Sequence, residues 1–308
     1  MSLVLRPEKV LPERIAVDYL HKVIAALPAE MRADDGGRTI GLANTVIVHF
    51  LGREWLEANI KPDIKRPGFL RLDFSSDVRR EASVFRVVEL AESLYNLQHI
   101  PGFDDCIEQI RAGGDKIQSA CAELDFARFL YIHEVDFHFV VRKMRKGEDY
   151  DFELTYPDGL KVPADAKCKF ETTKIDPAGI HKSLKKAKGQ LPKDRPGIIF
   201  IKVPQSWISD LEVAKEMVNV GKDFLKTTGR IISVKFYVSQ LQTVNKMVMH
   251  RHALREITNS DSRFHDGRNW DLFTDYPVPS SWNGMPPKWQ RLFFFPNSRQ
   301  GEGRAANI

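Results

Sequence analysis

Apolar residues in the first 130 positions recur at the spacing of helices. Ile15, Tyr19 and Val23 follow a period of about 3.6 residues, so their side chains would share one face of a helix. We therefore predict a helical N-terminal region over residues 1–114, followed by the first helix of a core. The same period predicts further helices at 42–60, 77–97 and 115–130.

Beyond residue 135 the period changes to two, which is typical of strands. The residues Pro157, Asp158 and Gly159 form a strong turn signal between two of the predicted strands. A later run is continuously apolar and rich in β-branched residues, which favours a buried central strand. Strands are predicted at 136–141, 151–156, 160–170, 197–203 and 230–238, and 246–254 is a further candidate strand.

These periods predict an α/β protein with a mixed central sheet flanked by helices. The sheet and its helices would occupy residues 115–245, after the helical N-terminal region. Residues 246–308 alternate aromatic residues with prolines, as at Trp282 and Pro286. We expect that section to be an irregular extension whose final residues are disordered.

Composition favours a folded protein in a reducing compartment. The 308 residues are 43% apolar and 28% charged, close to the globular average of about 25% charged. The three cysteines have no metal-ligand spacing, and no apolar run approaches the roughly 18 residues of a membrane span. The first residues contain Pro, Glu and Arg where a signal peptide needs an apolar block. We therefore expect a cytoplasmic protein with no membrane partner.

Positive charge is concentrated in one segment. The net charge of the chain is +5, and residues 181–195 alone hold six Lys or Arg against one Asp. Such a helix would position a polyanion by contacts with its phosphates. The alternative is an ordinary solvated helix face.

The candidate chemistry lies on the predicted hairpin. Side chains alternate faces in a strand, so Asp165 and Lys167 share one face and Ala166 lies on the other. A two-residue hairpin loop would place Asp151 opposite Ala166. A three-residue loop or one bulge shifts the pairing and brings Asp151 across from Asp165 or Lys167. The functional hypothesis requires this shifted register.

Two carboxylates that face each other across paired strands repel each other unless a cation lies between them. Asp151 and Asp165, completed by water, are ligands that suit Mg²⁺ or Mn²⁺. A bound metal can activate water and neutralise the charge that grows on a phosphate. Lys167 could orient the attacking water and offset the same charge.

Asp151 followed by Asp165-Ala166-Lys167 resembles the motif of the PD-(D/E)XK nuclease superfamily. The resemblance implies a restriction-endonuclease-like core, metal-dependent cleavage of phosphodiesters, and a role for Glu123 as an auxiliary metal ligand. The resemblance extends to the Lys-rich helix containing Gln190 and to the strand at 197–203, which match the helix and strand that follow the motif in the family. The sequence departs from the family motif at two positions. Tyr150 precedes Asp151 where the motif has Pro, and the acid of the (D/E)-x-K strand is Asp165, the rarer choice.

The leading hypothesis is thus a Mg²⁺-dependent nuclease with catalytic residues Asp151, Asp165, Lys167 and Glu123. DNA is favoured over RNA as the substrate, and the N-terminal helices could form a homodimer or contact a partner protein. Two alternatives stay open. One is a catalytically inactive nucleic-acid-binding or protein-interaction module on the same fold, and the other is an unrelated α/β protein with a polar hairpin. The residues expected to contact nucleic acid are Lys169, Lys182, Lys185, Lys186, Lys188 and Gln190.

Overall fold

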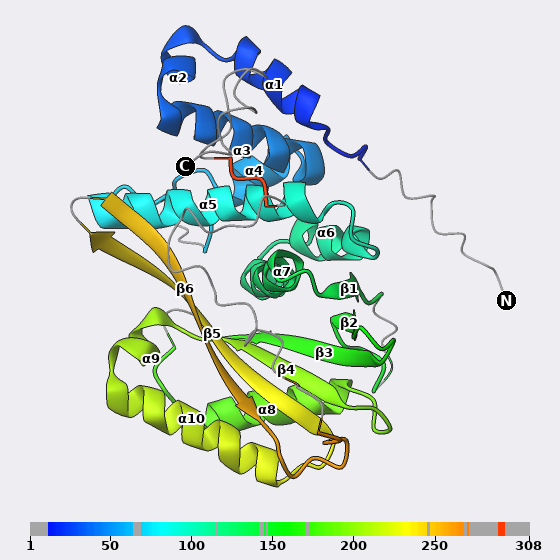
Figure 1. The fold of residues 1–308 in the computed structure, drawn as a ribbon. Coiled ribbons are helices and arrows are strands. Elements are labelled where there is room, and N and C mark those ends of the chain that lie inside the picture. The colour runs from blue at the N-terminus through cyan, green and yellow to red at the C-terminus, as the bar shows by residue number, and fades with distance from the viewer. Residues whose placement is uncertain are drawn as a thin grey trace, which may run out of the picture.

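A computed structural model describes most of the chain (Figure 1). Three features of the sequence-based prediction lie outside the described residues: the final residues, Trp282 and the boundary at 245–246. For residues 209, 239–244 and 247–253 only the backbone is described. The described residues are 12–63, 69–114, 116–141, 145, 147–169, 173–244, 247–267, 270 and 289–292.

Helices fill the first part of the chain, as predicted. The helix expected at 42–60 differs in its bounds, because it begins at Asp35 and breaks at Gly52. Asp34 caps its first turn by accepting a hydrogen bond from the Gly37 amide. Gly52 has φ of 91°, a backbone conformation that glycine adopts without steric cost. The helices are α1 (Val17–Ala26), α2 (Ala29–Ala33), α3 (Asp35–Leu51), α4 (Arg53–Asn59), α5 (Asp77–Leu97), α6 (Phe103–Arg111) and α7 (Lys116–Ile132).

Within the described part of the chain, six strands form one mixed sheet in the order β1-β2-β3-β4-β5-β6. The pairs β1–β2, β2–β3 and β5–β6 are antiparallel, whereas β3–β4 and β4–β5 are parallel. This confirms the predicted α/β class with a mixed sheet. The strands are β1 (Asp136–Phe139), β2 (Phe152–Thr155), β3 (Lys161–Cys168), β4 (Gly197–Lys202), β5 (Ile231–Val244) and β6 (Met247–Thr258).

Helices cover both faces of the sheet (Figure 1). The helix α8 (Pro177–Gln190) connects β3 to β4, and α9 (Gln205–Ser209) and α10 (Leu211–Lys226) connect β4 to β5. All six residues of β4 are buried, as expected for a central strand. Ile198 and Phe200 pack on the α7 side, and Ile199 and Ile201 pack on the side of α8 and α10. Alternate side chains of β4 therefore pack into two hydrophobic cores, one on each face of the sheet.

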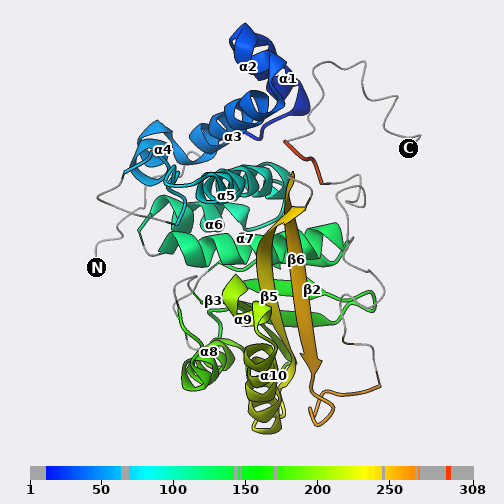
Figure 2. The same ribbon diagram turned by 90° about the vertical axis from the view of Figure 1, so that its left-hand side faces the viewer.

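The N-terminal helices share their core with the sheet. Leu42 of α3, Leu94 of α5 and Phe126 of α7 belong to one buried cluster that also contains Phe152 of β2. Figure 2 shows α5 lying directly over α6 and α7, with α1–α4 beyond it. The described helices α1–α6 thus share a core with α7 and the sheet.

The sheet continues beyond residue 245, where we expected the core to end. β6 pairs with β5 along its whole length, from Met247 opposite Val244 to Thr258 opposite Ser233. The far ends of the two strands reach α5 in both views (Figures 1 and 2). The candidate strand at 246–254 is therefore confirmed, and the expected irregular extension gives way to a strand over its first part.

Within the described ranges, none of the helices combines the length and the hydropathy needed to cross a membrane.

Candidate active site

The β2–β3 hairpin has the shifted register that the functional hypothesis requires. Phe152 pairs with Ala164 and Thr155 pairs with Lys161, so the next positions in the series are Asp151 and Asp165. The loop is closed by hydrogen bonds from the Tyr156 amide to the Leu160 carbonyl and from the Gly159 amide to the Tyr156 carbonyl, at 2.9 and 2.8 Å. A three-residue loop with glycine in the left-handed region is a common hairpin connection.

That left-handed position is Gly159, whose φ is 82°. The loop therefore holds Pro157, Asp158 and Gly159 between the paired ends Tyr156 and Leu160. The predicted odd loop is confirmed, and it sets which side chains of the two strands meet.

Asp151 directly precedes β2 and is held by the backbone of β3. Its carboxylate Oδ2 accepts a hydrogen bond of 2.8 Å from the Ala166 amide. Its own amide donates to the Ala164 carbonyl at 3.2 Å, and its carbonyl accepts from the Val140 amide at 3.0 Å. Asp151 is buried. These contacts fix its carboxylate beside the Asp165-Ala166-Lys167 segment.

Asp165 and Lys167 form an ion pair along β3. The Lys167 ammonium lies 2.5 Å from Asp165 Oδ2 and donates to the Ala166 carbonyl at 3.2 Å. The side chain of Asp165 is fully buried, whereas that of Lys167 remains 18% exposed. As predicted, Ala166 lies on the other face of the strand, where it packs with Ala164 into the core on the α7 side. The charge of Asp165 is therefore balanced inside the fold by an ammonium that also reaches solvent.

Glu123 approaches the hairpin from α7. Glu123 and Asp151 line one small pocket together with Asp105 and Gln109 of α6. The pocket has a volume of about 10 Å³, which is on the order of one water molecule. Asp165 and Lys167 are not among its lining residues. The structure thus brings Glu123 and Asp151 together at one pocket, whereas Asp165 pairs with Lys167.

The helix α6 brings two polar residues to this pocket that the sequence did not single out. Asp105 and Gln109 reach it because α6 starts tight against β1. A Cβ on Gly102 would lie 2.1 Å from the Phe139 carbonyl oxygen, so only glycine allows this approach. The signal in the sequence is weak: Asp104 and Asp105 follow Gly102, and acidic residues favour the first turn of a helix.

A buried ion pair fixes α7 on the sheet two residues from Glu123. The Lys202 ammonium at the end of β4 lies 2.5 Å from Asp125 Oδ2. Burial raises the pKa of the Asp125 carboxyl, and the Lys202 charge opposes that shift. Because both side chains are about nine-tenths buried, separating them would leave a charge without compensation. The pair therefore helps to position Glu123.

The donor set at the pocket suits Mg²⁺ more than a metal that needs a full protein cage. In the part of the chain that the structure describes, no group of three His, Cys, Asp or Glu side chains is arranged around a common metal position. Magnesium commonly takes one or two protein carboxylates and completes its shell with water and phosphate oxygens. Glu123 and Asp151 are such a pair, facing a space of the size of one water molecule or ion.

The residues expected to contact nucleic acid fall into two groups. Lys182, Lys185 and Lys186 are exposed on α8. Lys169 instead donates to the Gly179 carbonyl at 2.9 Å, and burial lowers its pKa. Gln190 donates to the Asp149 carbonyl at 2.8 Å and so ties the end of α8 to the segment before Asp151.

Lys188 is half-buried, with its ammonium 6.0 Å from the centre of the Phe224 ring. Burial, followed by the charges of Arg230 and Lys185, lowers its pKa. Its ammonium therefore lies near α10, and its charge belongs to a cationic group at the end of α8.

A polar triad braces the other side of the hairpin. The Tyr150 hydroxyl donates to Glu153 at 2.7 Å, and Arg195 donates to Glu153 and to the Tyr150 oxygen at 2.9 and 2.8 Å. Burial, followed by the hydrogen bond to Glu153, raises the pKa of Tyr150 to about 12. The triad joins the start of β2 to the loop before β4, on the side of the sheet covered by α8.

Neither a protein-family model nor a curated protein matches the chain.

Proposed function

We propose that this protein is a Mg²⁺-dependent nuclease that hydrolyses phosphodiester bonds in nucleic acid, with DNA favoured over RNA. The hairpin register supports this proposal most directly, because it puts the Asp151 carboxylate on the backbone of the Asp165-Ala166-Lys167 segment. In a hairpin that was merely polar surface, both aspartates would stay exposed, because burying a charge costs free energy. Asp151 and Asp165 are instead both buried.

The order of elements also supports a restriction-endonuclease-like core. A helix carrying Glu123 precedes three antiparallel strands, and a basic helix then leads to a parallel buried strand. That is the order which the resemblance to PD-(D/E)XK nucleases implies. The helices of residues 1–114 would be an addition to this core.

Each site residue has a role in the proposed reaction. Glu123 and Asp151 would hold the metal, and Asp165 would complete the acidic site while keeping Lys167 in place. When bound, Mg²⁺ would supply an activated water and positive charge against the phosphate. The Lys167 ammonium would orient that water, and the exposed Lys182, Lys185 and Lys186 would hold flanking phosphates.

The inactive binding module is the second candidate. It is favoured by the tight pairing of Asp165 with Lys167, because a carboxylate neutralised by an ammonium is a weaker metal ligand. Such a protein would bind nucleic acid in a salt-sensitive way, with no effect of EDTA and no product.

Cleavage assays distinguish the two candidates. Plasmid, linear duplex and single-stranded DNA, with RNA of the same sequence, are incubated with the wild type in Mg²⁺ or in EDTA. The test variant is Asp165→Asn, which removes the charge and keeps the shape. Its matched control is Asp223→Asn, the same change at a position 72% exposed on α10.

We expect cleavage in Mg²⁺ alone, a loss of about 100-fold or more in Asp165→Asn, and no loss in Asp223→Asn. Equal rates in the wild type and Asp165→Asn would rule out the assigned site. Salt-sensitive binding with no product in any metal would support the inactive module instead.

A further inference from the structure

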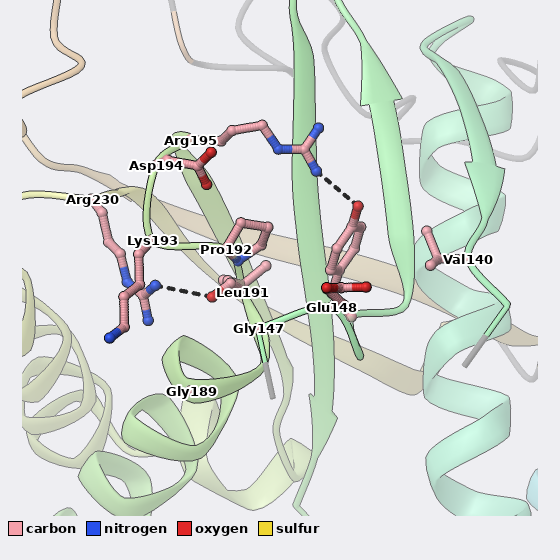
Figure 3. Close-up of a pocket in the computed structure, with 11 residues that line it drawn as sticks. Val140, Gly147, Glu148, Gly189, Leu191, Pro192, Lys193, Asp194, Arg195 and Arg230 are labelled. Atoms are coloured by element: carbon pink, nitrogen blue, oxygen red, sulfur yellow. Dashed lines mark hydrogen bonds between the residues drawn. The ribbon is translucent and has the colours of Figure 1, made fainter. Parts of the chain in front are cut away.

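A larger pocket opens beside the candidate active site, at the C-terminal end of α8 (Figure 3). Its volume is about 560 Å³, within the range of roughly 300–1,000 Å³ that small-molecule sites occupy. Its walls come from the segment 147–150, the segment 189–195, Val140 and Arg230. The nuclease site uses none of this volume.

Charged side chains of both signs line the pocket. They are Lys193, Arg195 and Arg230, with Glu148 and Asp194. In Figure 3, Arg230 and Lys193 lie on one side of the pocket and Val140 lies on the other. Arg195 is already paired with Glu153 at 2.9 Å, so Lys193 and Arg230 are the cations of this lining that can face a phosphate.

Arg230 is fixed at the wall formed by the end of α8. Its guanidinium donates to the Leu191 carbonyl at 2.9 Å and also to the Lys188 carbonyl. Burial, followed by the charge of Arg263, lowers the pKa of Arg230, and the charge of Arg230 in turn helps to lower that of Lys188. Cations are therefore crowded here, and a bound anion would relieve their repulsion.

The pocket also offers aromatic and apolar surface. The Tyr150 ring lines it, braced by the Arg195 guanidinium 5.9 Å from the ring centre. Leu191, Pro192 and Val140 complete this apolar surface. Aromatic and apolar side chains are the usual platforms for a nucleobase, because every base has a π face.

The two pockets share a wall. Val140 lines both of them, and its amide donates to the Asp151 carbonyl at 3.0 Å. Tyr150 of the larger pocket is followed directly by Asp151 of the smaller one, and consecutive Cα atoms lie about 3.8 Å apart. A ligand in the larger pocket would therefore end next to the candidate metal site.

We propose that this pocket binds one nucleotide of the substrate strand, adjacent to the phosphate that is cleaved. Arg230 and Lys193 would face its phosphate, and the Tyr150 side would receive its base. Glu148 and Asp194 could accept hydrogen bonds from amino groups of the base. The position next to the scissile phosphate rests on the proposed nuclease function, but nucleotide binding by the pocket itself requires neither metal nor catalysis.

Binding of thymidine 5′-monophosphate (dTMP) and of a 12-nucleotide single-stranded DNA tests this inference. Both titrations use the full chain in EDTA, so that no cleavage occurs. Gly189→Trp fills the pocket from α8, where a Cβ at Gly189 meets nothing within 4 Å. Gly189→Ala is the matched control, since it makes the same backbone change without filling the space.

A second pair of variants tests charge alone. Lys193→Glu reverses an exposed cation at the pocket, and Lys222→Glu makes the same change at an exposed position of α10. We expect Lys193→Glu to weaken binding of the 12-mer about tenfold and to reduce its salt dependence by about one phosphate contact. Lys222→Glu should leave both quantities near the wild-type values.

We expect wild type and Gly189→Ala to bind dTMP saturably, the 12-mer to compete with it, and Gly189→Trp to lose at least about tenfold in affinity for dTMP. Absence of saturable dTMP binding, lack of competition by the 12-mer, or equal affinity in Gly189→Trp would each overturn the inference. Nucleotide binding without cleavage by the wild type would leave the pocket standing and remove the nuclease. Metal-dependent cleavage with an unchanged KM in Gly189→Trp would support the nuclease and overturn the inference about the pocket.

Discussion

Lys167 places its ammonium 2.5 Å from Oδ2 of Asp165, two positions earlier on the same strand. The pair is asymmetric, because Asp165 is fully buried and Lys167 keeps contact with solvent. The ammonium thus stabilises the buried carboxylate in the resting protein. In the proposed reaction the same ammonium would face the water and the phosphate, so one residue would serve both the fold and the chemistry.

Removing Lys167 should therefore affect stability in a way that depends on Asp165. Lys167→Met leaves a buried carboxylate without its ammonium and should cost about 1–3 kcal/mol in the free energy of unfolding. The double variant Asp165→Asn/Lys167→Met should cost less than Lys167→Met alone, since no buried charge remains. Urea unfolding measures all three. Lys161→Met, at a position 59% exposed on the same strand, is the control and should change stability by about 0.5 kcal/mol or less. Equal costs for the single and double variants would contradict the pairing.

Glu123 should be required for metal affinity before any substrate is present. Glu123→Gln keeps the shape of the side chain and removes one of the two carboxylates at the small pocket. We expect the Kd for Mg²⁺, measured by calorimetry, to rise by about tenfold or more, with a similar rise in Asp151→Asn. Glu108→Gln, at a 41% exposed position of α6, should leave Mg²⁺ binding unchanged. A metal affinity indifferent to Glu123 and Asp151 would exclude them as ligands.

The triad of Tyr150, Glu153 and Arg195 should make stability depend on acid pH. Burial opposes ionisation of Glu153, but the hydrogen bonds from Tyr150 and Arg195 outweigh it and lower the pKa of the carboxyl. The contribution of a carboxyl with a lowered pKa is complete above its unfolded pKa of about 4.3, and is lost as pH falls through the folded value. Glu153→Gln should thus be less stable than the wild type at pH 7.

The difference in Tm between the wild type and Glu153→Gln should shrink as the pH is lowered below about 4. Thermal unfolding in a pH series measures this. Glu212→Gln, at an 81% exposed position, should follow the wild-type curve at every pH. A constant Tm difference across the series would show that Glu153 contributes by packing and not by its charge.

Glu92 should control the docking of residues 289–292 on α5. Its fully buried carboxylate accepts hydrogen bonds from the Leu292 amide at 2.9 Å and from the Trp289 indole at 3.3 Å, and it lies 3.2 Å from Arg291. Glu92→Gln removes the charge that compensates Arg291 and weakens all three contacts. We expect a red shift of Trp289 emission and faster proteolysis in this region, with a cost of about 1–3 kcal/mol in stability. Emission and proteolysis identical to the wild type would show that the apolar contacts of Trp289 suffice.

The outline of the fold could be predicted from local patterns. The change of period from 3.6 to two separates helices from strands, and the continuous apolar run over 197–203 marks the central strand β4. Where the pattern was wrong, a local feature explains the error. Gly52 interrupts a stretch whose apolar spacing continues across it, so α3 and α4 were taken as one helix.

The sequence alone predicted the hairpin and limited it to a few registers, and the structure has the one with an odd loop. An odd loop ending in Gly159 and the alternation of strand side chains place Asp151 next in register to Asp165, with Lys167 on the same face as Asp165. These relations depend only on a turn and on the period of a strand, both of which act over fewer than about 20 residues.

Only the tertiary structure decided what surrounds that hairpin. The approach of α6 that carries Asp105 and Gln109, the meeting of Glu123 with Asp151, and the large pocket below Arg195 all join segments far apart in the chain. They depend on how helices dock on a sheet, which is set by many weak apolar contacts acting together and by no local pattern.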